Sequence, residues 1–474
     1  MKPASFSRQE LFSRVPVPKA LWTMAVPTVI SQLINLIYNM VDAYFIGRTG
    51  NSYMAAATTL TLTLVMLNVA LSNLFGIGGG SLVSRLNGGG APDRARQVSA
   101  FSVWGAVAIA LLYSVLTGLF LDPLLRFLGA SDQTIGYARS YALIVIVIGS
   151  LPAILAAALA HLLRNTGYAG KASLGLSAGG ILNCLLDPLF MFVLLPRGQE
   201  VTGAAIATAL SNVFSCAYLL IAYKKAAGES PLSLRLRDAA ATRKEDQRNL
   251  FTVGIPSAML TGLFDLANIS LNRLAAAHSD LVLAGIGIVM KVERLPNAVN
   301  IGICQGMLPI VAFNYASGDH GRMRETISTA RKWGLTVSLL CIVLFELFAP
   351  QVSRAFLSVS AGDAQHAENA VRTLAYAALF LRIRCIASPL QFSNYHASFC
   401  LQAMGDGKGT LLHAFVRELV FYIPLMTILD KLFGETGMAA ALPVGEACGA
   451  VFAVWLLNRW IRKNGQQEGK DVNS

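Results

Sequence analysis

Apolar stretches long enough to cross a bilayer recur along this chain, and they constrain its fold more than any other feature. A membrane helix needs about 20 mostly apolar residues, and we predict twelve such spans, centred near residues 33, 65, 108, 147, 183, 213, 261, 295, 340, 386, 418 and 450. Only 14% of the 474 residues are charged, against about 25% in a soluble domain. The stretches are too long for the alternating strands of an outer-membrane barrel, so the sequence predicts an all-α integral membrane protein.

The basic residues predict how these spans are oriented. The net charge is +12, but Lys and Arg are interleaved with the spans, which argues against a nucleic-acid partner. An even number of spans puts both termini on one side, and placing that side in the cytoplasm puts 25 of the 38 Lys and Arg inside. We therefore expect a multi-pass protein of the cytoplasmic membrane with both termini cytoplasmic. Residues 1–17 lack the apolar core of a signal peptide.

The chain also contains an internal duplication. AVPTVISQLINLIYNM near Pro27 parallels GIPSAMLTGLFDLANI near Pro256, and the polar stretch between the halves reads as a linker. We predict a cytoplasmic tail at residues 1–18, a first lobe of six helices at 19–224, a cytoplasmic linker at 225–247, a second six-helix lobe at 248–463 and a cytoplasmic tail at 464–474. Such duplication is typical of transporters, whose two lobes face each other across a central cleft.

Polar residues form a stripe on the first predicted span. Gln32, Asn35, Asn39 and Asp42 are spaced three, four and three residues apart, so they share one helical face. An acid at membrane depth is costly and is by default a functional residue, so we expect Asp42 to face protein or water. The alternative is that Asp42 only ends the helix near the membrane surface.

The fifth and sixth spans add three residues at a similar depth. Asn183 and Asp187 are four residues apart on one helix, and Thr208 lies on the next. From the helical rise, these residues and Asp42 lie roughly 8 to 12 Å below the outer boundary. Such oxygen-bearing side chains can hold a hard cation or share a proton, because two close carboxylates cannot both ionise at low cost. Alternatively, Asp187 only begins a kink at Pro188 and faces a neighbouring arginine.

The second half repeats the polar stripe but not the acid of the first. Thr261, Asp265, Asn268 and Asn272 share a face, whereas Asp42 aligns with Leu271. Charged residues of both signs also lie within the predicted spans of this half: Lys291, Glu293, Arg294, Arg382, Arg384, Arg417 and Glu418. We expect internal ion pairs here, across a polar interface between the lobes, with a structural role favoured over a gating role. His161, His396 and His413 are too scattered for a metal site.

Motifs for cofactors and catalysis are weak. The run GIGGG at 76–80 lacks the preceding strand and lysine of a phosphate loop, so we interpret it as close helix packing. GDGKGT at 405–410 also fails the Walker spacing, and the seven cysteines form no CxxC pair. We predict no enzymatic activity and no cofactor, with H⁺ or Na⁺ as the coupling ion.

The pattern PxxxxQxxxxxxNxVDxxFIGR in the first span, the GIGGG run and NxxxDP in the fifth span resemble the prokaryotic multidrug and toxic compound extrusion (MATE) transporters. The resemblance covers residues from about 19 to 463. It implies two six-helix bundles that alternate between outward-open and inward-open states, with an acid of the first helix coupling transport to protons or sodium. That acid matches Asp42, and the rest of the family's cluster matches Asn183, Asp187 and Thr208. In one branch an acid on the seventh helix joins this site, and Asp265 lies near that position.

Together these features predict a secondary antiporter that exports amphipathic, cationic drugs or toxic compounds, and we expect a monomer. Pro27 should kink the first helix, so loading Asp42 with a proton or cation could change how that helix packs. The alternative in the same architecture is a flippase for lipid-linked oligosaccharides. A flippase is expected to line its cavity with many Arg and Lys, and the spans of the first half contain almost none.

Overall fold

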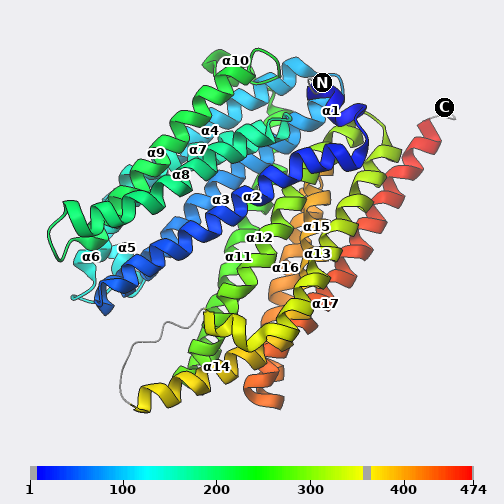
Figure 1. Ribbon diagram of the computed structural model, residues 1–474. Coiled ribbons are helices and arrows are strands. Elements are labelled where there is room, and N and C mark those ends of the chain that lie inside the picture. The colour runs from blue at the N-terminus through cyan, green and yellow to red at the C-terminus, as the bar shows by residue number, and fades with distance from the viewer. Residues whose placement is uncertain (1–7, 356–363, 472–474) are drawn as a thin grey trace, which may run out of the picture. The chain divides into compact units, whose positions relative to one another are not determined.

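This computed structural model describes residues 8–355 and 364–471 of the chain (Figure 1). The outermost residues of the two predicted tails, and residues 356–363 of the predicted second lobe, lie outside the described residues. Within the described ranges all regular elements are helices, which confirms the predicted all-α class.

The first half contains α1 (Arg8–Ser13), α2 (Val17–Arg48), α3 (Ser52–Gly88), α4 (Pro92–Leu119), α5 (Leu121–Phe127), α6 (Ile135–Ala142), α7 (Ser150–Asn165), α8 (Ala169–Leu189) and α9 (Glu200–Ala226). Two π-helical segments, η1 (Leu143–Ile148) and η2 (Phe190–Leu194), follow α6 and α8. The linker contains α10 (Leu236–Ala240). The second half contains α11 (Lys244–His278), α12 (Asp280–Ala316), α13 (His320–Ala355), α14 (Ala364–Cys385), α15 (Ser388–Met404), α16 (Gly407–Phe415), the π-helical segment η3 (Val416–Tyr422) and α17 (Ile423–Asp471).

These helices accommodate the twelve predicted spans. In the described part of the chain nine helices are long and apolar enough to cross a membrane, and the bent pair Ile135–Ile148 and Ser150–Asn165 adds a tenth. The stretch Gly407–Trp460 counts once in that total, yet its backbone breaks at Gly434, where φ is 62° and ψ is −145°, so it supplies two spans. The less apolar pair α14 and α15 corresponds to the remaining span, centred near residue 386.

Local sequence explains where the helices of the first half begin and end. Gly50, with φ of 67°, separates α2 from α3, and the side chain of Asn51 accepts a hydrogen bond from the Tyr53 N–H at 2.9 Å to cap α3. Gly90, with φ of 74°, ends the turn after α3, and Pro92 begins α4. The predicted spans are therefore separated by tight turns.

The chain packs into two compact units. The first comprises the described part of Met1–Thr261 together with Gln305–Thr326 and Gln402–Gly407, and the second comprises the remaining described residues of the second half. In the first unit, α2, α3, α4, α7, α8 and α9 run side by side (Figure 1), with α2 against α8, α3 against α4 and α7, and α8 against α9. Its buried core includes Phe75, Ile154, Leu159, Leu219 and Tyr223.

The glycine run of α3 lies where neighbouring helices approach most closely. A Cβ added to Gly78 would lie 2.7 Å from the carbonyl oxygen of Leu250, and one added to Gly79 would overlap the side chain of Ser102. A Cβ on Gly80 would lie 2.5 Å from the Asn165 side chain. The run is therefore a helix-packing surface, as we predicted, and not a phosphate loop.

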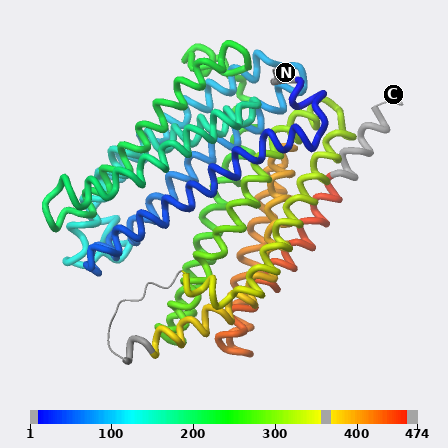
Figure 2. Tube along the Cα trace, viewed as in Figure 1, coloured from blue at the N-terminus to red at the C-terminus, as the bar shows by residue number. Residues whose placement is uncertain are grey.

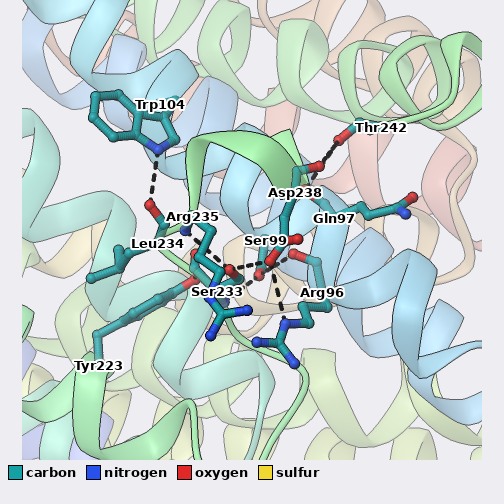
Figure 3. A network of polar contacts seen from close by, with 10 residues as sticks. All are labelled: Arg96, Gln97, Ser99, Trp104, Tyr223, Ser233, Leu234, Arg235, Asp238 and Thr242. Atoms are coloured by element: carbon teal, nitrogen blue, oxygen red, sulfur yellow. Dashed lines mark hydrogen bonds and ion pairs between the residues drawn. The ribbon is translucent and has the colours of Figure 1, made fainter. Parts of the chain in front are cut away.

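The linker, residues 225–247, packs against α4 through a network of polar contacts (Figure 3). The Ser233 N–H donates to the Ser99 hydroxyl at 3.0 Å, Asp238 pairs with Arg96 at 3.3 Å, and Trp104 donates to a linker carbonyl at 3.1 Å. These contacts satisfy backbone groups of a segment that has little regular structure of its own.

The second unit has its own core, formed mainly by α11, α12, α14 and α17. Phe380, Leu381, Met426 and Met438 are among its buried side chains. Figure 2 follows the trace of this unit from green through yellow and orange to red, and the chain reverses direction between the orange and red segments. This unit contains several buried charged residues, which are considered below.

Candidate functional site

Helix α2 brings Asp42 to the face that packs against α8. The carboxylate is half-buried, and its Oδ1 atom is fully buried with no hydrogen-bond partner in the described part of the chain. Pro27 lies inside α2, fifteen residues before Asp42, and removes one backbone donor from the helix. A buried carboxylate oxygen without a donor is costly, and a proton or a cation would remove that cost.

Helix α8 supplies the second carboxylate of the site. Asp187 is fully buried and Asn183 is 2% exposed. The Asn183 amide is best satisfied when its nitrogen donates to Asp187 Oδ2 at 3.2 Å and its oxygen accepts from the Thr208 N–H at 3.3 Å. With the amide turned over, Asn183 still contacts the same two residues. Asn183 therefore bridges Asp187 on α8 to Thr208 on α9.

The two carboxylates are close enough for their charges to interact. The structure thus brings together the four residues predicted from the sequence, namely Asp42, Asn183, Asp187 and Thr208. Among the described residues Asp187 contacts Asn183 and forms no ion pair with an arginine. The side chains of these four residues offer carboxylate, amide and hydroxyl oxygens, which suit a proton or a hard monovalent cation.

Two tyrosines belong to this site and were not predicted. Tyr38 lies one turn before Asp42, its ring packs against Gly180 of α8, and its hydroxyl lies within electrostatic range of both carboxylates. The Tyr141 hydroxyl of α6 lies within interaction range of the Thr208 side chain. The i, i+4 spacing of Tyr38 and Asp42 was visible in the sequence, whereas no local pattern marks Tyr141.

The rest of the α2 stripe is more exposed. Gln32 donates to Gln305 Oε1 at 3.2 Å, which joins α2 to the part of α12 that belongs to the first unit. Asn35 and Asn39 are exposed, and the Asn39 amide donates to Asn35 Oδ1 at 3.0 Å. The face predicted to be polar is thus a hydrogen-bonded surface that leads toward Asp42.

The stripe of α11 does not form a comparable cluster. Asp265 and Asn268 are half-buried and Asn272 is exposed, and in the described ranges no hydrogen bond joins the three. Arg294 lies within electrostatic range of Asp265. Leu271, which aligns with Asp42, is fully buried in the apolar core of the second unit.

Internal ion pairs are present, but the pairs of Arg384 and Arg417 lie within the second unit, whereas we expected pairs across an interface between the lobes. Arg384 Nε and Nη2 each lie 2.8 Å from the Glu293 carboxylate, and Arg417 pairs with Glu446. The interior histidines are hydrogen-bonded: His396 Nε2 contacts the Ile327 carbonyl oxygen at 2.9 Å, and His413 contacts side chains on both ring nitrogens. Glu446 was not singled out from the sequence.

Comparison with known proteins identifies the family. The model of the MatE family matches residues 27–194 and 256–428, once in each half of the chain, and both matches begin at or beside the paired prolines Pro27 and Pro256. The chain belongs to the MatE family. It is therefore a membrane transporter, and the predicted duplication is confirmed. The two matches contain Asp42, Asn183 and Asp187 in the first half and Asp265 in the second.

Relatives of this MatE protein match along nearly the whole chain. The multidrug export protein MepA of Staphylococcus aureus (strain MRSA252) is 28% identical over 449 residues, which cover 94% of this chain and 95% of MepA. MepA of Staphylococcus saprophyticus matches to the same extent.

Solved structures of the family share the fold. A MATE structure in complex with MaL6 has a TM-score of 0.88 at 22% identity, covering 96% of this chain and 98% of that one. An outward-facing multidrug resistance MATE transporter of the MOP superfamily has a TM-score of 0.87 at 23% identity, covering 97% and 98%. At this identity the similarity describes the fold, and it supports the twelve-helix arrangement.

Proposed function

We propose that this protein is a secondary active antiporter that exports amphipathic, cationic compounds in exchange for protons or Na⁺. The MatE membership and the names of the MepA relatives support multidrug export. The observation that carries the coupling mechanism is the buried, unpartnered Oδ1 of Asp42 beside the fully buried Asp187. Such an arrangement favours binding a positive charge.

Asp42 and Asp187 bind the coupling ion in this proposal, and Asn183 and Thr208 position it. A proton would be shared between the two carboxylates. Na⁺ would take oxygen ligands from Asp42, Asp187, Thr208 and the Asn183 amide. In either case the ion neutralises part of the charge of the two acids. Both carboxylates cannot be charged at low cost, because the surrounding protein has a low dielectric constant.

Coupling to transport acts through α2. Pro27 interrupts the backbone hydrogen bonds of this helix, so the segment between Pro27 and Asp42 can change its packing without unfolding the rest. An ion on Asp42 stabilises one packing, and its release favours the other, which is a two-state switch. The exposed Asn35 and Asn39 would meet the substrate, with Asp265, Asn268 and Asn272 as polar positions of the second half.

We also propose the remaining features of the sequence-based prediction. The lobes are residues 19–224 and 248–463, the tails and the linker at 225–247 are cytoplasmic, and the protein acts as a monomer in the cytoplasmic membrane. The excess of Lys and Arg on the assigned inside supports this orientation.

The test is export of a fluorescent cationic dye from proteoliposomes under a proton gradient or a Na⁺ gradient applied separately. We expect one gradient to drive export by the wild type and the drive to be lost in Asp42→Asn. Asp132→Asn is the matched control, because Asp132 has the same chemistry, is 89% exposed and pairs with Arg126 at the surface. Driven export by Asp42→Asn at the wild-type rate would contradict the proposal. Failure of the wild type to move any dye under either gradient would favour a lipid flippase.

A further inference from the structure

A cluster in the second unit contains more acids than bases. Arg417 and Glu418 lie on η3 and Glu446 lies on α17, and each of the three residues is 4% exposed. Each buried charge without a partner is costly in a medium of low dielectric, so buried charges are expected to balance. One guanidinium between two carboxylates leaves one negative charge in excess.

Glu446 is the carboxylate that neutralises Arg417. Its two oxygens accept from Arg417 Nε and Nη2, with Nε at 3.0 Å, in the bidentate geometry of strong arginine pairs. Asn394 of α15 donates to Glu446 Oε2 at 2.6 Å. Both oxygens of Glu446 are thus supplied with donors.

Glu418 is left without such donors. Its contact with Arg417 is an ion pair of 3.6 Å, beyond hydrogen-bond range, and in the described ranges its carboxylate accepts no hydrogen bond. The Arg417 Nε nearest to it already donates to Glu446. A charged Glu418 would therefore be buried with weak compensation.

Among the residues that the structure describes, no other base near Glu418 balances its charge. The titratable and charged groups nearest to Glu418 are Arg417, Glu446, Tyr395 and Tyr422. Arg384, which is paired with Glu293, lies beyond Tyr422. His413 lies one turn before Arg417. Arg384 is matched by the bidentate contact with Glu293. His413 Nε2 lies 3.0 Å from Asn394 Oδ1, and its Nδ1 lies 2.9 Å from the Ser398 hydroxyl, which can donate to it. His413 can therefore remain neutral.

The backbone supports this arrangement. Arg417 and Glu418 are adjacent in sequence and both are buried. The seven-residue π-helical segment η3 carries both. Single π-helical turns are frequent at functional sites.

We propose that Glu418 is a proton-binding residue of the second half, separate from Asp42 and Asp187. The carboxylate takes a proton from water and becomes a neutral carboxylic acid, which leaves Arg417 and Glu446 as a balanced pair. A metal cation would need several oxygen ligands, and those of Glu446 are occupied by Arg417 and Asn394. A role for this proton in transport rests on the proposed antiport, but its binding does not.

The test measures the C=O stretch of protonated carboxylic acids by infrared spectroscopy of the purified protein in lipid. We expect a band at neutral pH that disappears in Glu418→Gln and remains in Asp42→Asn. Glu446→Gln should also remove the band. In this variant Glu418 is the one acid left beside Arg417, so it becomes the charged partner of the arginine and loses its proton. Glu346→Gln is the matched control, since Glu346 is a 41% exposed glutamate of the same unit.

Three results would overturn the proposal: an unchanged band in Glu418→Gln, an unchanged band in Glu446→Gln, or displacement of the proton by Na⁺ at fixed pH. A band that is absent from the wild type and appears in His413→Gln would instead assign the charge balance to a protonated histidine and would also contradict the proposal. If Glu418→Gln does not fold, Glu446→Gln decides alone. Because the readout needs no transport, a protein that exports nothing can still confirm the site.

Discussion

The guanidinium of Arg322 forms a hydrogen bond with the backbone of Phe12, in which Nε donates to the Phe12 carbonyl oxygen at 2.6 Å. Its Nη2 donates to the carbonyl oxygens of Leu11 and Val15. Phe12 is 1% exposed, and its ring lies 5.6 Å from that of Phe313. The arginine thus caps the end of α1 and fastens the N-terminal segment to the first turn of α13 within the first unit.

Replacing Arg322 should release this segment. Arg322→Gln removes charge-assisted hydrogen bonds to three carbonyls, so we expect a loss of about 1.5–3 kcal/mol in the stability of the attachment. Limited proteolysis before α2 should become faster, and thermal unfolding of the purified protein should shift to lower temperature. Arg324→Gln is the control, because Arg324 is exposed two residues away. Equal proteolysis rates in the two variants would show that Arg322 does not hold the segment.

The glycine surface of α3 gives a second prediction. In Gly78→Ala the new Cβ meets the Leu250 carbonyl oxygen at 2.7 Å and Gly254 Cα at 2.8 Å, and neither backbone atom can rotate away. We expect destabilisation by about 1–3 kcal/mol, measured as a lower unfolding temperature in detergent. Gly170→Ala on α8 is the control, since its Cβ meets nothing within 4 Å and alanine favours helix by about 0.5–1 kcal/mol. The close-packing explanation fails if both variants unfold alike.

The sequence predicted the parts of the site that share a helix. Asp42 and its stripe, and Asn183 with Asp187, follow from i, i+3 and i, i+4 spacing, and Thr208 followed from depth. Tyr141 could not be predicted, because its contact with Thr208 depends on how α6 packs against α9.

The same limit applies in the second half. Glu446 reaches Asn394 across 52 residues of sequence, so neither the partner of Arg417 nor the isolation of Glu418 can be derived from local spacing. The π-helical segment η3, on which two adjacent charged residues are buried, could not be predicted from local sequence either.

Tyr141 provides a test of the coupling site that leaves its acids in place. Tyr141→Phe removes only the hydroxyl that interacts with the Thr208 side chain, a loss of about 0.5–1.5 kcal/mol, and we expect gradient-driven dye export to slow by roughly 2- to 12-fold. The measurement is the initial export rate under a fixed gradient. Tyr137→Phe, one turn earlier on α6, should keep the wild-type rate. A normal rate in Tyr141→Phe would exclude the hydroxyl from the coupling step.

The pair of Glu293 and Arg384 distinguishes a structural ion pair from a gating one. Both side chains are nearly buried, at 12% and 4% exposed, and each guanidinium contact is 2.8 Å. Removing one partner leaves an uncompensated buried charge, so Arg384→Met and Glu293→Leu should each cost about 3–5 kcal/mol. The double variant replaces both charges by apolar groups, and its stability should return to near that of the wild type.

The free energies of unfolding of the wild type, the two single variants and the double variant, measured in detergent, complete this double-mutant cycle. Dye export by the double variant then decides whether the pair is structural or gating. A pair that only stabilises the second unit predicts a stable double variant with export close to wild type. A gating pair predicts a stable double variant whose export is lost, because opening and closing would need the charges to separate and re-form. We expect the first result, since the contact is bidentate, buried and confined to one compact unit.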